Sequence, residues 1–345
     1  MSSQDTVLVL TCRDDAHADH LLPHLLSRGV RVARYDTGDF PLSSDLTATL
    51  TSNGWAGVLH WDSGSLELNE VLSVWYRRPA RFRFAPGTPG VRLEFLHNEA
   101  LRGLGGVLRS LPCRWVNHPD DLVRAEYKPW QLQAATRHGL RCPRTMVTND
   151  PRAARAFFEQ CEGRVIYKTL SASVIVDEAG DGHGVYTSAV HRRHLSADHA
   201  VRATSCLFQE HIGKELDLRV TIVGRSAISV AIHSQERASS MLDWRSDQNG
   251  LRHSLHELPQ DVRDRCLALV GDLNLRFAAV DMIVTPAGEY VFIEVNPNGQ
   301  WAWLEDVTAV NIHDALADEL CRPAACDSEQ RRPSSSPCGA AWRGA

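Results

Sequence analysis

The sequence lacks the features that would place it in a membrane, in the secretory pathway or on nucleic acid. No uncharged apolar run approaches the roughly 18 residues that a membrane-spanning helix needs. The apolar stretch near the N-terminus has no basic residue before it and is too short for a secretory signal. With 37 basic and 42 acidic residues the formal net charge is −5, which gives no general attraction to nucleic acid. These absences predict a cytoplasmic protein that binds neither membranes nor nucleic acid.

Several catalytic and metal-binding signatures are also missing. The nine cysteines are scattered and include no Cys-x-x-Cys pair, which argues against a disulfide framework and against a zinc ribbon. There is no Walker-type GxxxxGK[ST], no HExxH, no GxSxG and no zinc-deaminase pattern. His17, His20 and His24 fall on similar sides of one predicted helix, where they could ligate a metal. The sequence suggests no fourth ligand beside them, so a solvated helix face is the favoured interpretation.

The residues that are present describe a folded globular protein, since 43% are hydrophobic and 23% are charged. An apolar run at Thr6–Thr11, a helical stretch at 15–27 closed by Gly29, and a strand at 30–37 form a βαβ unit, which implies a parallel sheet. The region continues with strands at 56–61 and 72–76, a helix at 91–109 and a turn at 117–119. We take residues 1–118 as the first domain.

The rest of the chain begins with helices and then turns to longer strands. Asp120 or Asp121 can cap a helix that runs to about residue 138, with Gly139 as its stop, and Asp150 before a proline starts another helix. The elements predicted after it are strands at 164–170, 185–190, 207–212, 215–224 and 227–235, a helix at 261–274, and a hairpin of strands 277–284 and 289–296. The divisions that we derive are a central domain at 119–205, a C-terminal domain at 206–322 and a disordered tail at 323–345.

Three oxygen-donating side chains should meet on the C-terminal hairpin. Glu294 and Asn296 stand at i and i+2 of an apolar strand, so both emerge on one face, and Asp281 lies in the adjacent apolar strand. A carboxylate within a buried strand is costly unless it is paired or binds a metal. Oxygen donors from two neighbouring strands suit Mg²⁺ rather than Zn²⁺. The alternative is a set of edge-strand acids paired with nearby arginines.

Several basic side chains are candidates for contacts with phosphate. Lys168 lies in a mostly apolar strand, and a buried ammonium needs an anion, which a phosphate can supply. Arg219 shares a strand face with Asp217, so its guanidinium either contacts phosphate or is neutralised by that carboxylate. Lys128 is a weaker candidate because lysines on helices are usually solvated. The glycine-rich stretch at 180–184 either presents backbone N–H groups to a phosphate or simply connects two strands.

The order of these features along the chain resembles the ATP-grasp superfamily: two lysines, a glycine-rich stretch, Gln-Glu-His-Ile, Asp-Leu-Arg, an aspartate and Glu-x-Asn. The resemblance implies ATP and Mg²⁺ as cofactors. It assigns the nucleotide phosphates to Lys128 and Lys168, and the ribose to Glu215 or Asp217. The hinge that meets the adenine is assigned to Gln209, Glu210, His211 and Ile212, with Glu210 and Ile212 nearest the ring, and the Mg²⁺ ligands are Asp281, Glu294 and Asn296.

Further motifs resemble one branch of that superfamily, the microviridin-type ATP-grasp peptide ligases, which make graspetides by macrocyclising ribosomal precursor peptides. The motifs are Tyr-Arg-Arg-Pro at 76–79, Ala-Ile-His-Ser-Gln at 231–235, Asp-Trp-Arg at 243–245, and the stretch 281–301 that ends in NPNGQW. The likeness extends to about residue 320. It implies an α/β (α+β) chain with the ATP-grasp fold and an N-terminal βαβ pre-ATP-grasp domain.

The activity implied is an ATP-dependent ligation within a peptide. A substrate Asp or Glu carboxylate becomes an acyl phosphate, and a Thr or Ser hydroxyl or a Lys amine then displaces phosphate, which leaves ADP and phosphate as by-products. Arg219 would share the phosphate charge, and Arg245 would steady the acyl phosphate. The leader of the precursor peptide is expected beside the segment 164–190, at Val174, Ile175, Asp177 and Glu178. The alternative for this loop is a lid that closes over ATP.

Two other functions stay open from the sequence alone. One is a ligase of the same fold that acts on a free amino acid or adds glutamate to a protein C-terminus, which needs no leader peptide. The other is a non-catalytic protein that binds ATP or a peptide, because a fold does not by itself establish activity. The full set of phosphate and metal candidates argues against the second. The oligomeric state is also open, with a homodimer as the form common among ATP-grasp ligases.

Overall fold

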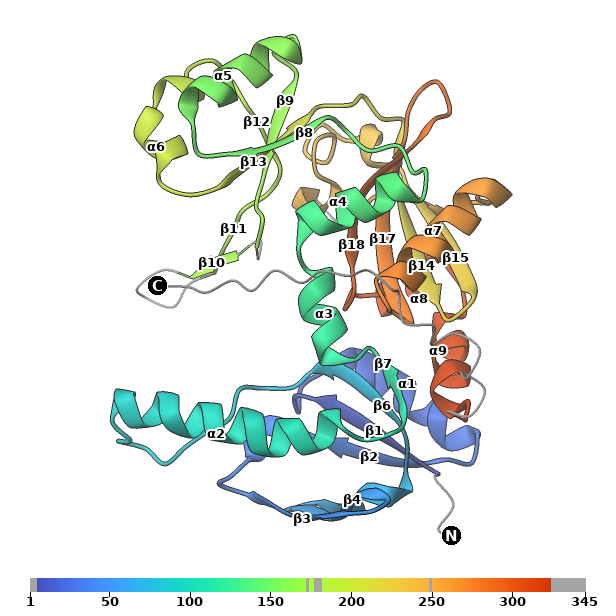
Figure 1. The fold of residues 1–345 in the computed structure, drawn as a ribbon. Helices are drawn as coiled ribbons and strands as arrows, with labels where there is room; N and C mark the ends of the chain where they lie inside the picture. Colours follow the sequence, from blue (N-terminus) through green and yellow to red (C-terminus); the bar gives the residue numbers. More distant parts are fainter. Residues whose placement is uncertain (1–4, 172–173, 177–181, 248–249, 324–345) are drawn as a thin grey trace.

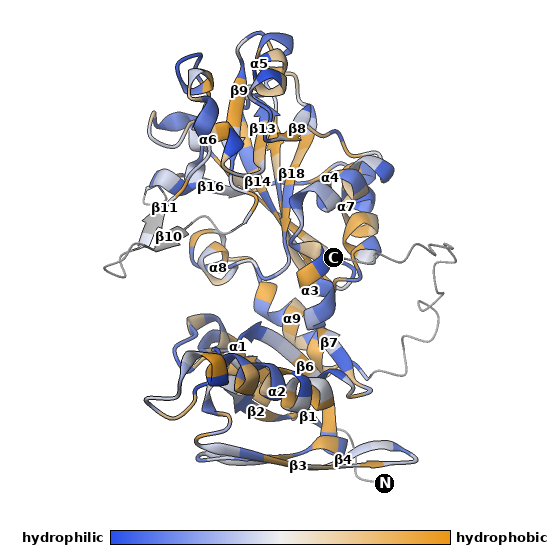
Figure 2. Cartoon of the chain, turned by 60° about the vertical axis from the view of Figure 1, so that its left-hand side comes forward, coloured by the Kyte–Doolittle hydropathy of each residue, from blue (hydrophilic) through white to orange (hydrophobic). Residues whose placement is uncertain are grey.

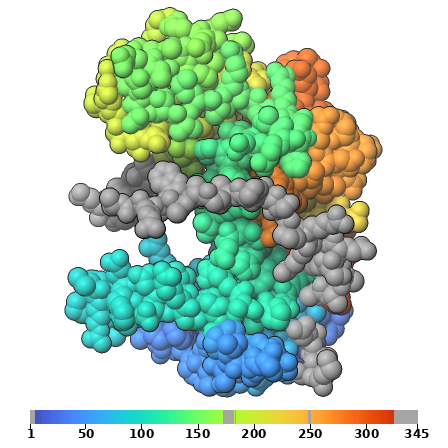
Figure 3. Space-filling model, in the orientation of Figure 1, coloured from blue at the N-terminus to red at the C-terminus, as the bar shows by residue number. Residues whose placement is uncertain are grey.

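The computed structural model describes residues 5–171, 174–176, 182–247 and 250–323, and the expected tail therefore lies almost wholly outside the described residues. The described chain contains five β-sheets, arranged in an N-terminal, a central and a C-terminal part (Figure 1). Helix α3 (Pro119–Ala125) lies between the N-terminal part and the rest of the molecule (Figure 1), and an open space is visible beside this green segment in the space-filling view (Figure 3). Among the described helices, none has both the length and the apolar character that crossing a membrane requires.

The N-terminal sheet confirms the predicted βαβ unit. Its four strands run parallel in the order β2-β1-β6-β7. Helix α1 (Ala16–Ser27) connects the first two strands, and the Asp15 side chain caps it by accepting a hydrogen bond from the backbone N–H of His17. The strands are β1 (Thr6–Thr11), β2 (Arg31–Tyr35), β6 (Val71–Arg78) and β7 (Arg114–Val116).

The strand predicted at 56–61 is real but belongs to a separate antiparallel sheet of three strands. Two of its members went unpredicted because they are short or are polar and mostly exposed, so neither shows an apolar run. The three strands are β3 (Ser44–Thr51), β4 (Gly54–Trp61) and β5 (Gly64–Glu67). Helix α2 (Gly90–Arg109) forms where the sequence predicts a helix.

The single helix predicted from residue 120 to 138 is wrong: the structure contains two helices, α3 (Pro119–Ala125) and α4 (Lys128–Arg137). His118, rather than Asp120 or Asp121, is the N-cap of α3, because its ring accepts a hydrogen bond from the backbone of Asp120. The chain restarts at α4 because proline follows Lys128; proline has no N–H to donate and suits only the first turn of a helix. Lys128 is therefore the first residue of a helix rather than a mid-helix lysine.

The central part is an antiparallel sheet with the order β12-β9-β13-β8. A two-stranded hairpin, β10 (Val174–Val176) and β11 (Gly182–Gly184), projects from it (Figure 1). The strand predicted at 185–190 is reduced to two residues. The sheet and its helices are β8 (Thr145–Thr148), α5 (Pro151–Gln160), β9 (Val165–Lys168), β12 (Ser188–Ala189), α6 (Asp198–Arg202) and β13 (Cys206–Glu210).

The C-terminal sheet has the antiparallel order β16-β15-β14-β17-β18, and its last two strands are the predicted hairpin. Its strands are apolar along most of their length (Figure 2), and the residues that pack with α4 and α7 form a buried core. The elements are β14 (Leu216–Val223), β15 (Ser226–Ile232), β16 (His253–Leu255), α7 (Gln260–Asp272), β17 (Phe277–Val284) and β18 (Tyr290–Asn296).

The last two helices, α8 (Ala302–Thr308) and α9 (Ile312–Cys321), return to the N-terminal sheet. Trp301 and Leu316 are fully buried in one cluster with Val7 of β1 and Trp75 of β6. A buried ion pair reinforces this contact, since Arg114 of β7 lies 2.7 Å from Glu319 of α9. Helix α9 and Trp301 therefore fix the first sheet to the rest of the molecule.

We expect Glu319→Ala to lower the free energy of unfolding by about 3–5 kcal/mol, because it removes a buried carboxylate that pairs with the Arg114 guanidinium and also with Arg276. Urea denaturation measures the change. Asp318→Ala on the same helix is the matched control: Asp318 also pairs with an arginine, Arg28, but is 65% exposed, so its loss should cost less than about 1 kcal/mol. Equal effects of the two variants would contradict this interpretation.

Candidate active site

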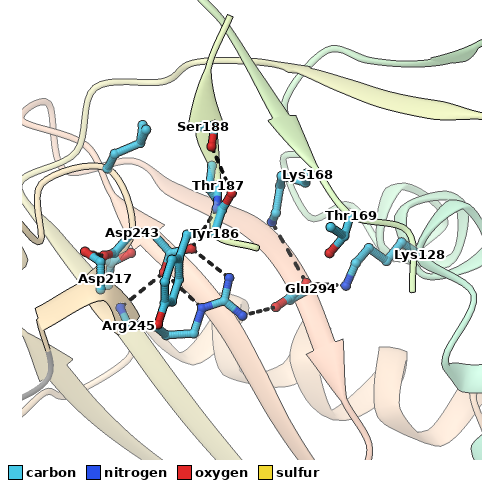
Figure 4. Close-up of polar contacts among 12 residues, drawn as sticks. Lys128, Lys168, Thr169, Tyr186, Thr187, Ser188, Asp217, Asp243, Arg245 and Glu294 are labelled. Atoms are coloured by element: carbon cyan, nitrogen blue, oxygen red, sulfur yellow. Dashed lines mark hydrogen bonds and ion pairs between the residues drawn. The ribbon is translucent and has the colours of Figure 1, made fainter. Parts of the chain in front are cut away.

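Two adjoining cavities lie between the central and C-terminal sheets. The first is lined by the end of β13, the segment after it, and parts of β14, β17 and β18. The second is lined by the start of α4, the end of β9 and the segment that follows β18. Four residues line both cavities: Lys168, Thr187, Arg245 and Glu294. Figure 4 shows these side chains close together, although they come from four separate places along the chain.

Glu294 is a buried carboxylate among three cations (Figure 4). Its Oε2 lies 2.7 Å from Lys128 Nζ and 3.9 Å from Lys168 Nζ, and its Oε1 lies 3.8 Å from Arg245 Nη1. Burial alone would raise the pKa of Glu294, but the charges of Lys168 and Lys128 hold that pKa well below its usual range. Burial in turn lowers the pKa of Lys168, against the opposing effect of Glu294. Both lysines predicted to bind phosphate therefore lie beside Glu294, one of the predicted metal ligands.

Asp281 lies opposite Glu294 in the register of β17 and β18, as the alternation of the two strands predicts. Its Oδ1 is 3.2 Å from Arg219 Nε, yet neither atom has a hydrogen-bond partner in a suitable geometry, and both are buried. Burial raises the pKa of Asp281, and the Arg219 charge opposes that rise. A buried carboxylate oxygen without a hydrogen bond, facing a second carboxylate, is the donor set that a hard divalent cation prefers. The site therefore fits Mg²⁺.

Asn296 extends that donor set into the second cavity. It follows Glu294 by two residues on β18 and lines the same cavity. Its Oδ1 accepts a hydrogen bond from the backbone N–H of Asn298 at 3.1 Å, and its second lone pair can still take a ligand. The three predicted metal ligands thus lie along one edge, with Glu294 between the two cavities.

Arg245 is held in place by a residue that the sequence analysis did not single out. Asp243 accepts hydrogen bonds from Arg245 Nε at 2.9 Å and from Nη2 at 2.8 Å, and also from the backbone N–H of Thr187 at 3.1 Å. Burial opposes ionisation of Asp243, but these bonds lower its pKa to about 2. The sequence could have indicated this pair, because Asp243 and Arg245 are two positions apart in the Asp-Trp-Arg motif.

A second buried pair involves Asp217, which lines the first cavity. Lys214 Nζ lies 2.9 and 2.7 Å from its two carboxylate oxygens, and Ser234 donates a hydrogen bond to it at 2.5 Å. The suggestion that Asp217 neutralises Arg219 is therefore wrong, since Arg219 pairs with Asp281. Glu215, the alternative ribose ligand, is exposed and is not among the residues that line the cavity.

The predicted hinge lines the first cavity with Gln209, Glu210, His211 and Ile212. Gln209 Nε2 donates to Thr145 Oγ1 at 3.0 Å, and Glu210 pairs with Arg144 at 3.0 Å. Both side chains are therefore held by the start of strand β8 and the residue before it. Apolar side chains also line this cavity. Ile166 is the strand neighbour of Gln209 in the central sheet, whereas the others come from the C-terminal sheet, so a planar ring can lie between the two sheets; they are Leu218, Met282, Ile283 and Ile293.

Contacts from distant parts of the chain hold strand β18 in position. Gln131 of α4 exchanges two hydrogen bonds with the backbone of Val295, at 2.8 and 2.9 Å, one helical turn after Lys128. Arg77 Nη1 donates to the Asn298 carbonyl at 2.6 Å, and Asn298 Nδ2 donates to the Arg77 carbonyl at 2.6 Å. The Tyr-Arg-Arg-Pro and NPNGQW motifs therefore contact each other directly.

Other predicted site residues do not join this centre. Arg219 is buried beneath Asp281 and lines neither cavity. Val174 and Ile175 belong to strand β10, whereas Asp177 and Glu178 lie outside the described residues. In the glycine-rich stretch, residues 182–184 form strand β11 rather than a phosphate-binding loop, and residues 180–181 lie outside the described residues.

Comparison with known proteins agrees with this geometry. Residues 6–122 match the MvdD pre-ATP grasp domain, and residues 125–320 match the RimK-like ATP-grasp domain. Among curated proteins, N-acetylaspartylglutamate synthase A of Homo sapiens is 21% identical over 61% of this chain, and beta-citrylglutamate synthase B of Danio rerio is 23% identical over 61%. The alignments cover 53% and 51% of those proteins, so the chain spans about half the length of the curated relatives.

Solved structures match over nearly the whole chain. Macrocyclase MdnB from Microcystis aeruginosa MRC is 33% identical with a TM-score of 0.75, covering 92% of this chain and 99% of that one. A Chryseobacterium gregarium RiPP-associated ATP-grasp ligase, solved with ADP and a leader and core peptide, is 28% identical with a TM-score of 0.85, covering 93% and 98%. Because the RimK-like domain accounts for more than half of the chain and MdnB aligns along its full length, the chain belongs to the ATP-grasp ligases, in the group with an MvdD-type pre-ATP-grasp domain.

Proposed function

We propose that this protein is an ATP-dependent macrocyclase of a ribosomal precursor peptide. It joins Asp or Glu side-chain carboxylates of that peptide to Thr or Ser hydroxyls or to Lys amines, and it releases ADP and phosphate. The observation that carries the proposal is the position of Glu294 at the junction of two cavities, in contact with three cations and opposite Asp281. The first cavity, which the hinge lines, suits a nucleotide. The second leaves room for a peptide carboxylate beside the phosphates of that nucleotide.

The residues at the junction divide the work between binding and charge stabilisation. Bound Mg²⁺, held by Asp281, Glu294 and Asn296, would supply positive charge next to the phosphoryl group that is transferred. Lys128 and Lys168 lie on either side of Glu294 and can share that charge with phosphate oxygens. The hinge and the Lys214–Asp217 pair line the remainder of the nucleotide cavity.

The two predicted catalytic arginines have different positions and, we infer, different roles. Arg245 lines both cavities, and Asp243 fixes its guanidinium plane, so it can stabilise negative charge that develops on a reacting carboxyl oxygen. Arg219 lines neither cavity and contacts Asp281 instead. It acts as a positioning residue that holds this carboxylate in the metal site.

A ligase for a free amino acid remains the second candidate, because residues 125–320 match the RimK-like ATP-grasp domain and the curated synthases match 61% of the chain. The solved relatives that match nearly the whole chain favour the peptide substrate, since the Chryseobacterium gregarium ligase was solved with a leader and core peptide. We also propose that the reaction takes place in the cytoplasm, because ribosomal peptides and ATP are available there. In addition, we propose three working units, residues 1–118, 119–205 and 206–322. The last two share the central sheet, because strand β13 at the start of the third unit pairs with β8 and β9 of the second.

The first prediction concerns the products. Incubated with its precursor peptide, ATP and Mg²⁺, the protein should remove one water equivalent from the peptide for each ring and convert ATP to ADP and phosphate, because an acyl phosphate forms at the γ-phosphoryl group. Mass spectrometry follows the peptide, and chromatography follows the nucleotides. AMP and pyrophosphate would show adenylation and exclude the mechanism, whereas ligation of free glutamate with no peptide turnover would favour the second candidate.

A second prediction concerns the metal site. Glu294→Gln should lower the rate of ring formation by at least about 100-fold while the fold persists, because the amide keeps the shape of the side chain but removes the charge that metal and lysines share. Glu289→Gln is the matched control, since Glu289 lies on the turn of the same hairpin and pairs with Arg141 on the surface. Near-normal dehydration by the Glu294 variant would refute the assignment.

We further propose that the leader of the precursor docks beside the β10–β11 hairpin, where Val174 and Ile175 supply apolar contacts and Asp177 and Glu178 pair with basic residues. A separate leader site is needed because the reacting centre reads only a few residues. Support comes from the projection of this hairpin beyond the central sheet (Figure 1).

Replacing Asp177 and Glu178 together by Ala should raise KM for a leader-bearing peptide with little change in KM for ATP. Steady-state kinetics with the full precursor measures both constants, and a leaderless core peptide serves as the control because its poor KM should not change. If the double variant weakens ATP binding and leaves the peptide KM unaltered, the segment is a nucleotide lid.

A further inference from the structure

A cluster of histidines lies between the N-terminal sheet and the last two helices, apart from the active site. His20 and His24 are one turn apart on α1, and His313 is the second residue of α9, so their contact joins the two ends of the chain. One ligand atom of each of these three residues lies within 4.8 Å of the others. Figures 1 and 2 both place α1 beside α9.

A buried carboxylate completes the cluster. Glu305 of α8 is only 8% exposed, and its Oε2 lies 2.6 Å from His20 Nε2. Its carboxylate also lies 2.9 Å from His313 Nδ1, and Oε1 accepts the backbone N–H of His313 at 2.7 Å. The sequence offered no fourth group for the histidines of α1, because Glu305 is separated from His20 by 285 positions.

The structure also corrects which histidines belong together. His17, the first of the three on α1, lies apart from the cluster: its Nδ1 accepts the backbone N–H of Ala302 at 3.4 Å, and its ring packs edge-on against Trp301. His313 takes its place, with its ring 3.8 Å from that of His24. The solvated helix face expected from the sequence is therefore wrong for His20 and His24, which are half-buried against α9.

We propose that His20, His24 and His313, with Glu305, form a binding site for a zinc ion. Three imidazoles and a carboxylate are a zinc donor set, whereas Mg²⁺ prefers oxygen ligands alone. Zn–N bonds of about 2.0–2.1 Å place tetrahedral ligand atoms about 3.4 Å apart, so the observed cluster closes with side-chain adjustments of about 1 Å. Glu305 contacts both His20 Nε2 and His313 Nδ1, so an ion that replaces these hydrogen bonds would meet the carboxylate and the two imidazole nitrogens together.

The charges around the cluster agree with a cation there. The nearest further carboxylate is that of Asp314, 3.6 Å from His313 Nε2. The neighbouring cation, Arg28, is paired with Asp314 at 3.0 Å and with Asp318 at 2.7 Å. A bound zinc ion would join α1 to α8 and α9, and thereby fasten the N-terminal sheet to the segment that follows the magnesium ligands.

Zinc binding by the full-length protein, prepared without a histidine tag and stripped with a chelator, tests the proposal directly. A competing chromophoric chelator measures affinity, with excess Mg²⁺ present to occupy the Asp281–Glu294 site. We expect one zinc per chain, a rise in Tm of at least about 2 °C on addition of zinc, and the visible spectrum of a tetrahedral site with Co²⁺. His24→Asn, His313→Asn and Glu305→Gln should each weaken zinc binding by at least about 10-fold.

Two controls assign the ion to this cluster. His194→Asn removes a histidine from an exposed pair in the central part, where the rings of His191 and His194 are 5.2 Å apart, and it should leave zinc affinity unchanged. Glu294→Gln should do the same, which separates this site from the catalytic metal whatever the activity of the protein. The proposal would be overturned if the wild type bound no stoichiometric zinc, or if the His24 and His313 variants bound zinc as tightly as the wild type. The cluster would then be only a set of hydrogen bonds between α1, α8 and α9.

Discussion

The structure depends on one buried carboxylate whose charge must be balanced. Glu294 lies in strand β18, nearly out of contact with water, and is stable there only because Lys128, Lys168 and Arg245 surround it. Each cation comes from a different place: the start of a helix, a central strand, and a turn after β15. The requirement to neutralise one charge therefore brings the central and C-terminal sheets together at the point where the two cavities meet.

Strand β18 is an edge strand, whose open side meets the backbone of Arg141 at Val291 and Phe292, but in the described part of the chain no strand lies on that side of Val295. Gln131 supplies the missing partner through a pair of hydrogen bonds to Val295, and thereby acts as a short substitute for another strand. The Arg77–Asn298 contact then fixes the segment beyond the strand to the N-terminal sheet. These contacts explain why a motif in the first domain accompanies the metal-binding motif: both position the same few residues.

Features with a local periodic signal could be predicted from the sequence. The βαβ unit follows from its alternation of element types, and the pairing of Asp281 with Glu294 follows because side chains alternate along two strands joined by a short turn. The proline after Lys128 indicates that a new helix begins there. The prediction of one continuous helix gave more weight to the helical pattern on both sides of this proline. Lys214 was missed because the sequence suggested only Arg219 or the ribose as partners of Asp217. Glu305 and His313 could not be found at all, because no local rule relates them to α1.

One short segment connects both ionic centres of the molecule. Glu294 and Asn296 belong to the magnesium site, Asn298 holds Arg77, and Trp301 packs against the imidazole of His20 at 5.6 Å just before Glu305. Glu294 and Glu305 are eleven positions apart, so one carboxylate can move relative to the other only if the chain between them bends. Trp301 is fully buried, which makes such bending costly. The packing of α1 against α8 and α9 therefore constrains the end of β18, and through it the edge along which the catalytic metal ligands lie.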